Sequence, residues 1–159
     1  MQLLISDANI LIDLEEGELL DAFFQLPYRF SIPDILYYEE LEVQHGHLLN
    51  LGLELGELTA ATMAYAAELI EQARGPSRND CFALALAKQE DCPLLTGDQA
   101  LRNLAHNNKV IVMGTIWVVE ELVQKGVIDI EMARSAYTKM RNNDRRLPWD
   151  IAFERLNAL

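Results

Sequence analysis

Short apolar runs alternate with longer segments of helical spacing, and this alternation restricts the fold more than any other feature of the chain. We predict buried strands at Leu3–Ile5, Phe30–Ile32, Leu94–Leu95 and Val110–Met113, and a weaker strand at Leu53–Leu55. Strand, helix and strand in succession favour right-handed crossovers, which place a parallel sheet between helices on both faces. The sequence therefore predicts a three-layer α/β/α fold with a central parallel β-sheet.

Helical segments fill the intervals between these strands. The predicted helices are Asp34–Leu49, Thr59–Arg74, Arg78–Gln89, Gln99–His106, Ile116–Lys125, Ile130–Met140 and Trp149–Leu156. No repeat or Pro/Gly linker interrupts them, so we predict one domain of 159 residues, with its core at about 1–125 and a C-terminal helical extension at about 126–159. Ligands of such folds bind where strands end and the next helices begin.

Cysteine usage and apolar run length indicate where the protein acts. Cys81 and Cys92 lack a CxxC spacing, which favours buried, reduced thiols. The start of the chain has no basic segment typical of a signal peptide, and the apolar run Val110–Val119 is too short to span a bilayer. We expect a cytoplasmic protein without membrane attachment.

The charge is uneven along the chain. The net charge is −12, which argues against a protein that simply coats nucleic acid, because such binding needs many cationic contacts. Residues 1–75 hold 14 of the 25 acidic residues but only Arg29 and Arg74 of the 13 basic ones. The segment Arg141–Arg146 is the basic run where we expect a phosphate backbone to dock, through Arg141, Arg145 and Arg146, unless it is simply a solvated helix end.

Four acidic residues fall near the expected binding edge of the sheet. Asp7 directly follows the first strand, Asp98 follows the strand at Leu94–Leu95, Asp80 opens a helix that is apolar throughout, and Glu40 lies about two turns into an earlier helix. Taken singly, they read as helix caps or as a surface acid. Taken together, they would repel by roughly 3 kcal/mol per pair at ~5 Å. Oxygen ligands without Cys or His would attract Mg²⁺ or Mn²⁺ rather than Zn²⁺.

The motifs Asp7-Ala8-Asn9, Glu40-Leu41, Asp80 before an Ala-rich helix and Leu94-Leu95-Thr96-Gly97-Asp98 resemble, in order and spacing, those of the PIN-domain nucleases. Within that family they are similar to the VapC-like toxins of bacterial toxin–antitoxin pairs. The resemblance covers roughly residues 1–125.

The resemblance implies an acidic quartet of Asp7, Glu40, Asp80 and Asp98 that binds metal and catalyses, with Asn9 and Thr96 as supporting polar groups. It implies Mg²⁺- or Mn²⁺-dependent hydrolysis of RNA by a toxin-like enzyme, a homodimer as the assembly and an antitoxin protein as partner. The ion would polarise the scissile phosphate and activate a water, so no side-chain nucleophile is needed.

Two other interpretations stay open at this point. A non-catalytic PIN-like scaffold, whose acidic pocket binds a metal or an arginine-bearing partner, is favoured by the net charge. A receiver-like domain built on Asp7 and Asp13 lacks the lysine expected after a late strand. Trp117 and Trp149 lie among apolar neighbours and are interpreted as packing residues rather than base-stacking platforms.

Helical phase separates Glu40 from its neighbour Glu39. With an apolar stripe through Tyr37, Leu41 and Leu48, Glu40 lies at the border of the buried face, about 60° from Tyr37 at roughly 100° per residue. Glu39 lies about 160° away on the same wheel and is predicted to point to solvent, away from the site.

Overall fold

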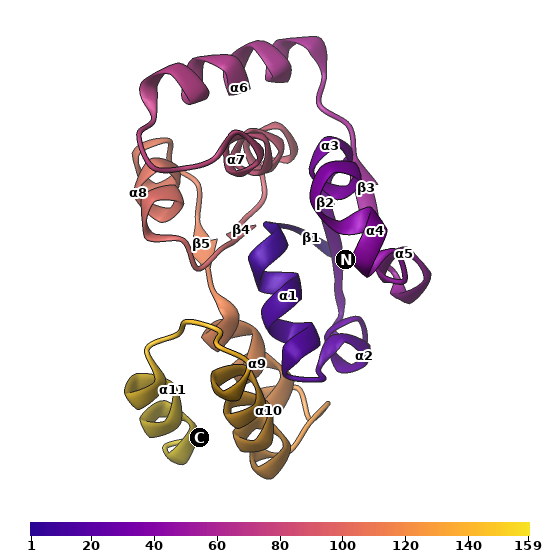
Figure 1. The fold of residues 1–159 in the computed structure, drawn as a ribbon, viewed down its shortest axis with the longest axis vertical. Coiled ribbons are helices and arrows are strands. Elements are labelled where there is room, and N and C mark those ends of the chain that lie inside the picture. The colour runs from indigo at the N-terminus through magenta and orange to yellow at the C-terminus, as the bar shows by residue number, and fades with distance from the viewer.

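The computed structural model describes residues 1–159, and its centre is a five-stranded, all-parallel sheet (Figure 1). The strands are β1 (Gln2–Ser6), β2 (Tyr28–Pro33), β3 (Glu54–Gly56), β4 (Leu94–Leu95) and β5 (Val112–Met113), in the spatial order β3-β2-β1-β4-β5. β1 is central and aligns Leu4 with Phe30 of β2 and Ile5 with Leu94 of β4. These side chains are buried, as expected of parallel strands covered on both faces. The predicted fold class is confirmed.

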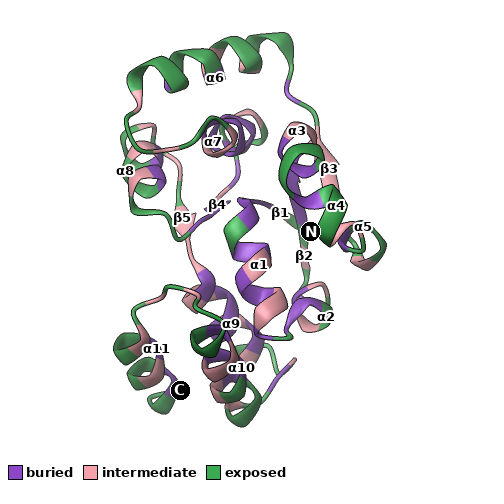
Figure 2. Cartoon of the chain, in the orientation of Figure 1, coloured by how far each residue is buried: buried purple, intermediate pink, exposed green.

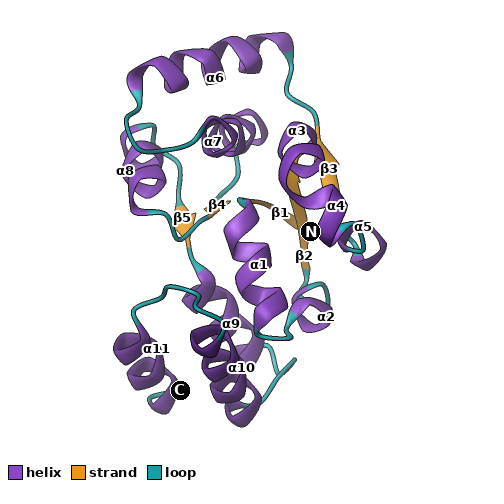
Figure 3. Cartoon of the chain, viewed as in Figure 1, coloured by secondary structure: helices purple, strands orange, loops and turns teal.

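Helices cover both sides of the sheet (Figure 1 and Figure 3). They are α1 (Ala8–Glu16), α2 (Leu20–Phe23), α3 (Asp34–Leu36), α4 (Glu42–His45), α5 (Leu48–Leu51), α6 (Ala60–Gln72), α7 (Arg78–Glu90), α8 (Gln99–Asn107), α9 (Thr115–Gln124), α10 (Ile130–Asn142) and α11 (Trp149–Asn157). α7 packs on β1, β2 and β4 and is covered by α6 on its other side, whereas α1 contacts α9 and α10. Every residue from Cys81 to Ala87 is buried, and Figure 2 shows this contrast between α7 and the mostly exposed α6.

The predicted helix Asp34–Leu49 is not continuous. A π-helical segment at Tyr37–Leu41 separates α3 from α4, and Gly46 ends α4 before α5 begins. The wider π turn keeps both Tyr37 and Leu41 buried, but it shifts the phase of the residues that follow relative to an α-helix. The first helix, α1, was not among the predicted ranges, but Asp7, which the sequence analysis read as a possible helix cap, is its N-cap.

One apolar core of 42 buried residues joins the sheet to the C-terminal helices. Tyr137, Met140, Ala152 and Leu156 belong to it and are almost fully buried. Both cysteines are free and buried, and burial raises the pKa of each thiol to about 11. None of the helices combines the length and apolar character that crossing a bilayer requires.

The buried hydroxyl of Tyr137 lowers the stability of the folded protein. Its side chain is buried, and its hydroxyl has no hydrogen-bond partner. We expect Tyr137→Phe to raise the free energy of unfolding by about 1 kcal/mol, because it removes an unsatisfied polar group without changing the packing. Tyr28→Phe is the matched control: it removes a hydroxyl that donates to Glu121 and should lower the free energy by about 1 kcal/mol. Denaturant titration measures both, and equal destabilisation by the two changes would contradict the assignment.

Candidate active site

Asp7 is the most buried acid of the predicted quartet. It follows β1 as the N-cap of α1, and only 1% of its surface is exposed. Its Oδ1 accepts a hydrogen bond from the Ile10 N–H at 2.9 Å, and its Oδ2 accepts one from the Thr96 hydroxyl. Because β1 and β4 pair in parallel with Ser6 opposite Leu95, the residues that follow them, Asp7 and Thr96, meet at the carboxyl edge of the sheet.

Burial dominates the electrostatics of Asp7. It raises the pKa of the Asp7 carboxyl to about 7, although the hydrogen bonds from Thr96 and Ile10 act in the opposite direction. The negative charges of Asp80 and Asp13 raise this pKa further. Asp80 therefore lies close enough to Asp7 for the two carboxylates to repel each other.

Asp98 and Asp80 both cap helices at this edge. Asp98 begins α8: its Oδ1 accepts from the Leu101 N–H at 2.8 Å, and its own N–H donates to Thr96 Oγ1 at 3.1 Å. Asp80 forms a capping box with Ser77, whose N–H donates to Asp80 Oδ2 at 3.0 Å. Each cap uses one carboxylate oxygen, and the other oxygen accepts no hydrogen bond from the protein. Capping and ligand binding are therefore compatible in both residues.

Glu40 joins this group through the first turn of α7. The Asn79 amide donates to Glu40 Oε2 at 2.9 Å and to Glu39 Oε2 at 3.1 Å, and Arg78 pairs with Glu39. The hydrogen bond from Arg78 is the main cause that lowers the pKa of Glu39. Glu39 is exposed, as the helical wheel predicted, but so is Glu40, and both accept from Asn79. The predicted separation of the two side chains is therefore wrong: the wheel assumed a regular α-helix, whereas both residues lie in a π turn.

A second buried acid, Asp13, links the site to the C-terminal segment. It accepts hydrogen bonds from Thr115 Oγ1 at 2.7 Å and from Arg145 Nε at 2.6 Å. Arg145 also donates to Asn9 Oδ1 at 3.2 Å. Burial raises the pKa of Asp13, and the bond from Arg145 opposes this most strongly.

A cavity of about 390 Å³ opens beside Asp98. Its lining combines Asn9, Asp13, Gly97 and Asp98 with the segment from Asp144 to Leu147. Residues of the predicted C-terminal extension thus form one wall of the candidate site.

The three arginines of the predicted phosphate-binding run have different environments. Arg145 is held by Asp13 and Asn9. Arg141 lies over the Phe153 ring, 5.2 Å from its centroid. Arg146 is exposed, pairs with no carboxylate and lines the cavity next to Asp98.

Sequence reasoning did not place Asp13, Thr115 or Asn79 in the site. A usable signal existed for Asp13, because Ile10, Asp13 and Leu14 share one stripe of α1 and all three are buried. An acid within an apolar helical stripe indicates a buried charge that needs a partner.

By donor type, the site fits a hard divalent cation. Its ligands would be carboxylate oxygens, and Oδ1 of Asn79, the residue before Asp80, is a buried oxygen without a hydrogen-bond partner. No three His, Cys, Asp or Glu side chains approach closely enough to form a metal-holding group. Two carboxylates that repel each other and an unpaired oxygen are therefore what the structure provides for a cation.

Comparison with known proteins identifies the family. A family model described as a PIN domain matches residues 3–159. The chain belongs to the PIN-domain family. No curated protein gave a significant match. The match extends through α10 and α11, so the C-terminal helices are part of this PIN domain, beyond the roughly 125 residues that carry the motifs. PIN domains are commonly nucleases, and the match does not distinguish the VapC type.

The pKa of Asp7 should be visible in the stability of this PIN domain. Between the ordinary carboxyl pKa of 3.8 and about 7, the folded protein holds a proton that the unfolded chain has released. The free energy of unfolding therefore falls as pH rises through this window. We expect wild type to lose up to about 4 kcal/mol relative to Asp7→Asn between pH 4 and pH 8, at about 1.36 kcal/mol per unit.

Denaturant titrations at a series of pH values measure this difference. Asp91→Asn removes the same charge from an exposed residue at the C-terminal end of α7, the end opposite Asp80. The plot of its unfolding free energy against pH should run parallel to that of wild type. A parallel curve for Asp7→Asn would show that Asp7 does not titrate near neutral pH.

Proposed function

We propose that this PIN domain is a Mg²⁺- or Mn²⁺-dependent endoribonuclease that hydrolyses RNA phosphodiester bonds. The observation that carries the proposal is the buried Asp7 carboxylate, held by Thr96 and repelled by Asp80. A buried carboxylate beside another negative charge is costly unless a cation or a proton neutralises it. Asp7, Glu40, Asp80 and Asp98 are the residues that would hold the ion. When bound, the ion would polarise the scissile phosphate and lower the pKa of a water.

The protein's own residues orient these ligands. Thr96 donates to Asp7 and accepts from the Asp98 N–H, so one hydroxyl fixes two of the acids relative to each other. Arg145 donates to Asn9 and to Asp13, and these two bonds hold Asn9 and the C-terminal wall of the cavity together. Such supporting contacts hold metal ligands in position and commonly affect metal affinity about 10- to 100-fold.

We further propose a toxin-like role in the cytoplasm, as a homodimer whose activity is held in check by a partner protein. The acidic first half of the chain supports this, because an arginine of the partner would engage a carboxylate with two hydrogen bonds and compete with the metal.

A non-catalytic scaffold is the second candidate, and two observations favour it. No three potential ligands form a metal-holding group, and Arg78 and Asn79 already occupy Glu39 and Glu40. In that function, the acidic pocket would bind an arginine-bearing partner without cutting RNA.

Cleavage of a mixed RNA pool with Mn²⁺, compared with EDTA, separates the two candidates. We expect cleavage only with the ion, and a loss of at least about a hundredfold in Asp98→Asn, roughly 2.7 kcal/mol of transition-state stabilisation. Asn caps a helix as well as Asp does, so the variant should stay folded.

Asp91→Asn again serves as the control and should cut within about twofold of wild type. Cleavage that persists in EDTA, or an Asp98→Asn variant as fast as wild type, would refute the nuclease proposal. A higher thermal midpoint with Mn²⁺ but no cleavage would support the scaffold, because the ion stabilises any native state that binds it.

Glu39 and Glu40 provide a second, internally matched test. Glu39 pairs with the Arg78 cation, whereas Glu40 contacts only the neutral Asn79 amide, so Glu40 keeps an uncompensated charge beside the site. Glu40→Gln should slow Mn²⁺-dependent cleavage at least about tenfold, or about 1.4 kcal/mol. Glu39→Gln should stay within about twofold, since exposed ion pairs contribute little. Equal losses would indicate a general effect of charge.

A further inference from the structure

Three cations without a carboxylate partner line adjoining cavities of the surface. Six of the 13 basic residues form ion pairs: Arg29, Arg78, Arg134, Lys139, Arg145 and Arg155. Of the remaining seven, Arg102, Lys109 and Arg146 line a row of adjoining cavities. Exposed cations without a partner can exchange their counterions for phosphates.

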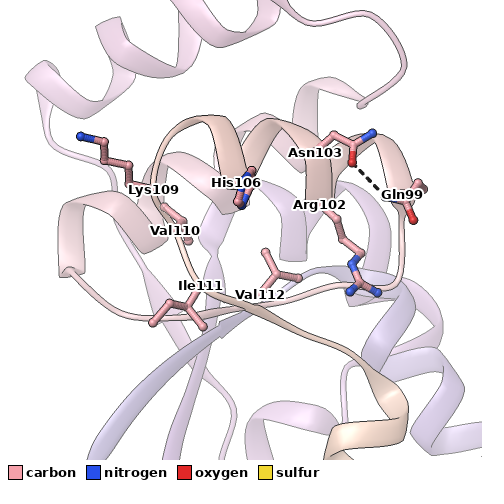
Figure 4. A pocket seen from close by; sticks show the side chains of 8 residues that line it. All are labelled: Gln99, Arg102, Asn103, His106, Lys109, Val110, Ile111 and Val112. Carbon is pink, nitrogen blue, oxygen red and sulfur yellow. Dashed lines mark hydrogen bonds between the residues drawn. The ribbon is translucent and has the colours of Figure 1, made fainter.

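The largest cavity, about 540 Å³, lies between α8 and the edge strand β5 (Figure 4). Gln99, Arg102, Asn103 and His106 recur at helical spacing and form the polar face of α8, and Lys109 follows the helix. Figure 4 shows Arg102 pointing from α8 toward Val112, while Lys109 extends at the opposite end of the cavity. Its lining contains no acidic residue, although the chain has 25.

A second hollow, about 350 Å³, connects this cavity to the candidate active site. It shares Arg102 with the first cavity, and it shares Gly97 and Arg146 with the cavity beside Asp98. Between its two arginines the lining is largely apolar and includes the half-buried Trp117. Trp117 packs against the core and Tyr28, as the sequence analysis expected, but it also lines this hollow. The order along the surface is therefore the acidic edge, a cation, an apolar hollow, and then further cations.

We propose that single-stranded RNA reaches the acidic edge along this track, here called the α8 track, formed by Arg146, Arg102, His106, Lys109 and the hollow at Trp117. Arg146, Arg102 and Lys109 contact successive phosphates, and an unpaired base enters the hollow against the indole. Duplex RNA does not fit this arrangement, because its bases are stacked and paired inside the helix. The proposal rests on the nuclease function proposed above and adds the route by which the substrate reaches the site.

Metal-free binding tests the track separately from cleavage. A fluorescently labelled 12-nucleotide single-stranded RNA is titrated with the full chain in EDTA, at several KCl concentrations, by anisotropy. Arg102→Gln, Lys109→Gln and Arg146→Gln should each weaken binding at least about threefold and reduce the slope of log K against log salt by about 0.7. Lys125→Gln removes an exposed, unpaired cation from the end of α9 and should leave the slope unchanged.

The fluorescence of Trp117 tests whether an RNA base enters the hollow. In a Trp149→Phe background, where Trp117 is the remaining tryptophan, the single-stranded RNA should quench the indole fluorescence, and the same sequence as a duplex should not. Base stacking on an aromatic ring is the expected cause.

The outcomes separate this proposal from the nuclease proposal. Wild-type binding and slope in all three track variants, an equal loss in Lys125→Gln, equally tight duplex binding, or no RNA binding at all would each overturn the α8 track. A chain that binds RNA through the track but never cuts it would refute the nuclease function alone. If the chain cuts RNA but the three track variants bind RNA as wild type does, only the α8 track is refuted.

Discussion

The contact between Asp7 and Thr96 is the interaction on which the rest of the site depends. A carboxylate that is almost completely buried must be hydrogen-bonded, neutralised or paired with a cation. Asp7 obtains its partners from α1 and from the end of β4, so the pairing of β1 with β4 and the start of α1 must form together. The same contact positions Asp98 through the Thr96 hydroxyl. Asp7 therefore organises the carboxyl edge of the sheet and is also the strongest candidate for a catalytic residue there.

The C-terminal segment depends on a second buried carboxylate. Asp13 is satisfied by Thr115 at the start of α9 and by Arg145 beyond α10. Breaking a buried pair of this kind on one side leaves an uncompensated charge, which typically costs about 3–5 kcal/mol. The segment from Asp144 to Leu147 is thereby held next to Asp98 and closes one side of the site. The segment between α10 and α11 thus lines the cavity, whereas the two helices themselves pack into the core.

The net charge of this protein disfavours RNA binding, whereas the local charge beside the adjoining cavities favours it. A total of −12 predicts weak attraction for RNA, but carboxylates within the fold neutralise six of the cations. Three of the unpaired cations, Arg102, Lys109 and Arg146, line adjoining cavities. The two cavities farther from Asp98 have no acidic residue in their linings. Where charges lie on the surface therefore matters more for binding than their sum.

The sequence by itself determined the parallel α/β fold, because alternating apolar runs and helical segments leave few other ways to bury both faces of the strands. It also placed Asp7 and Asp98 correctly at the ends of β1 and β4, since that position depends only on where each strand ends. Tertiary structure alone decided the contacts of Glu39, Asp13 and Arg145. A π turn resets helical phase without a clear sequence signal, and the bond between Asp13 and Arg145 joins residues 132 positions apart, which no local pattern encodes.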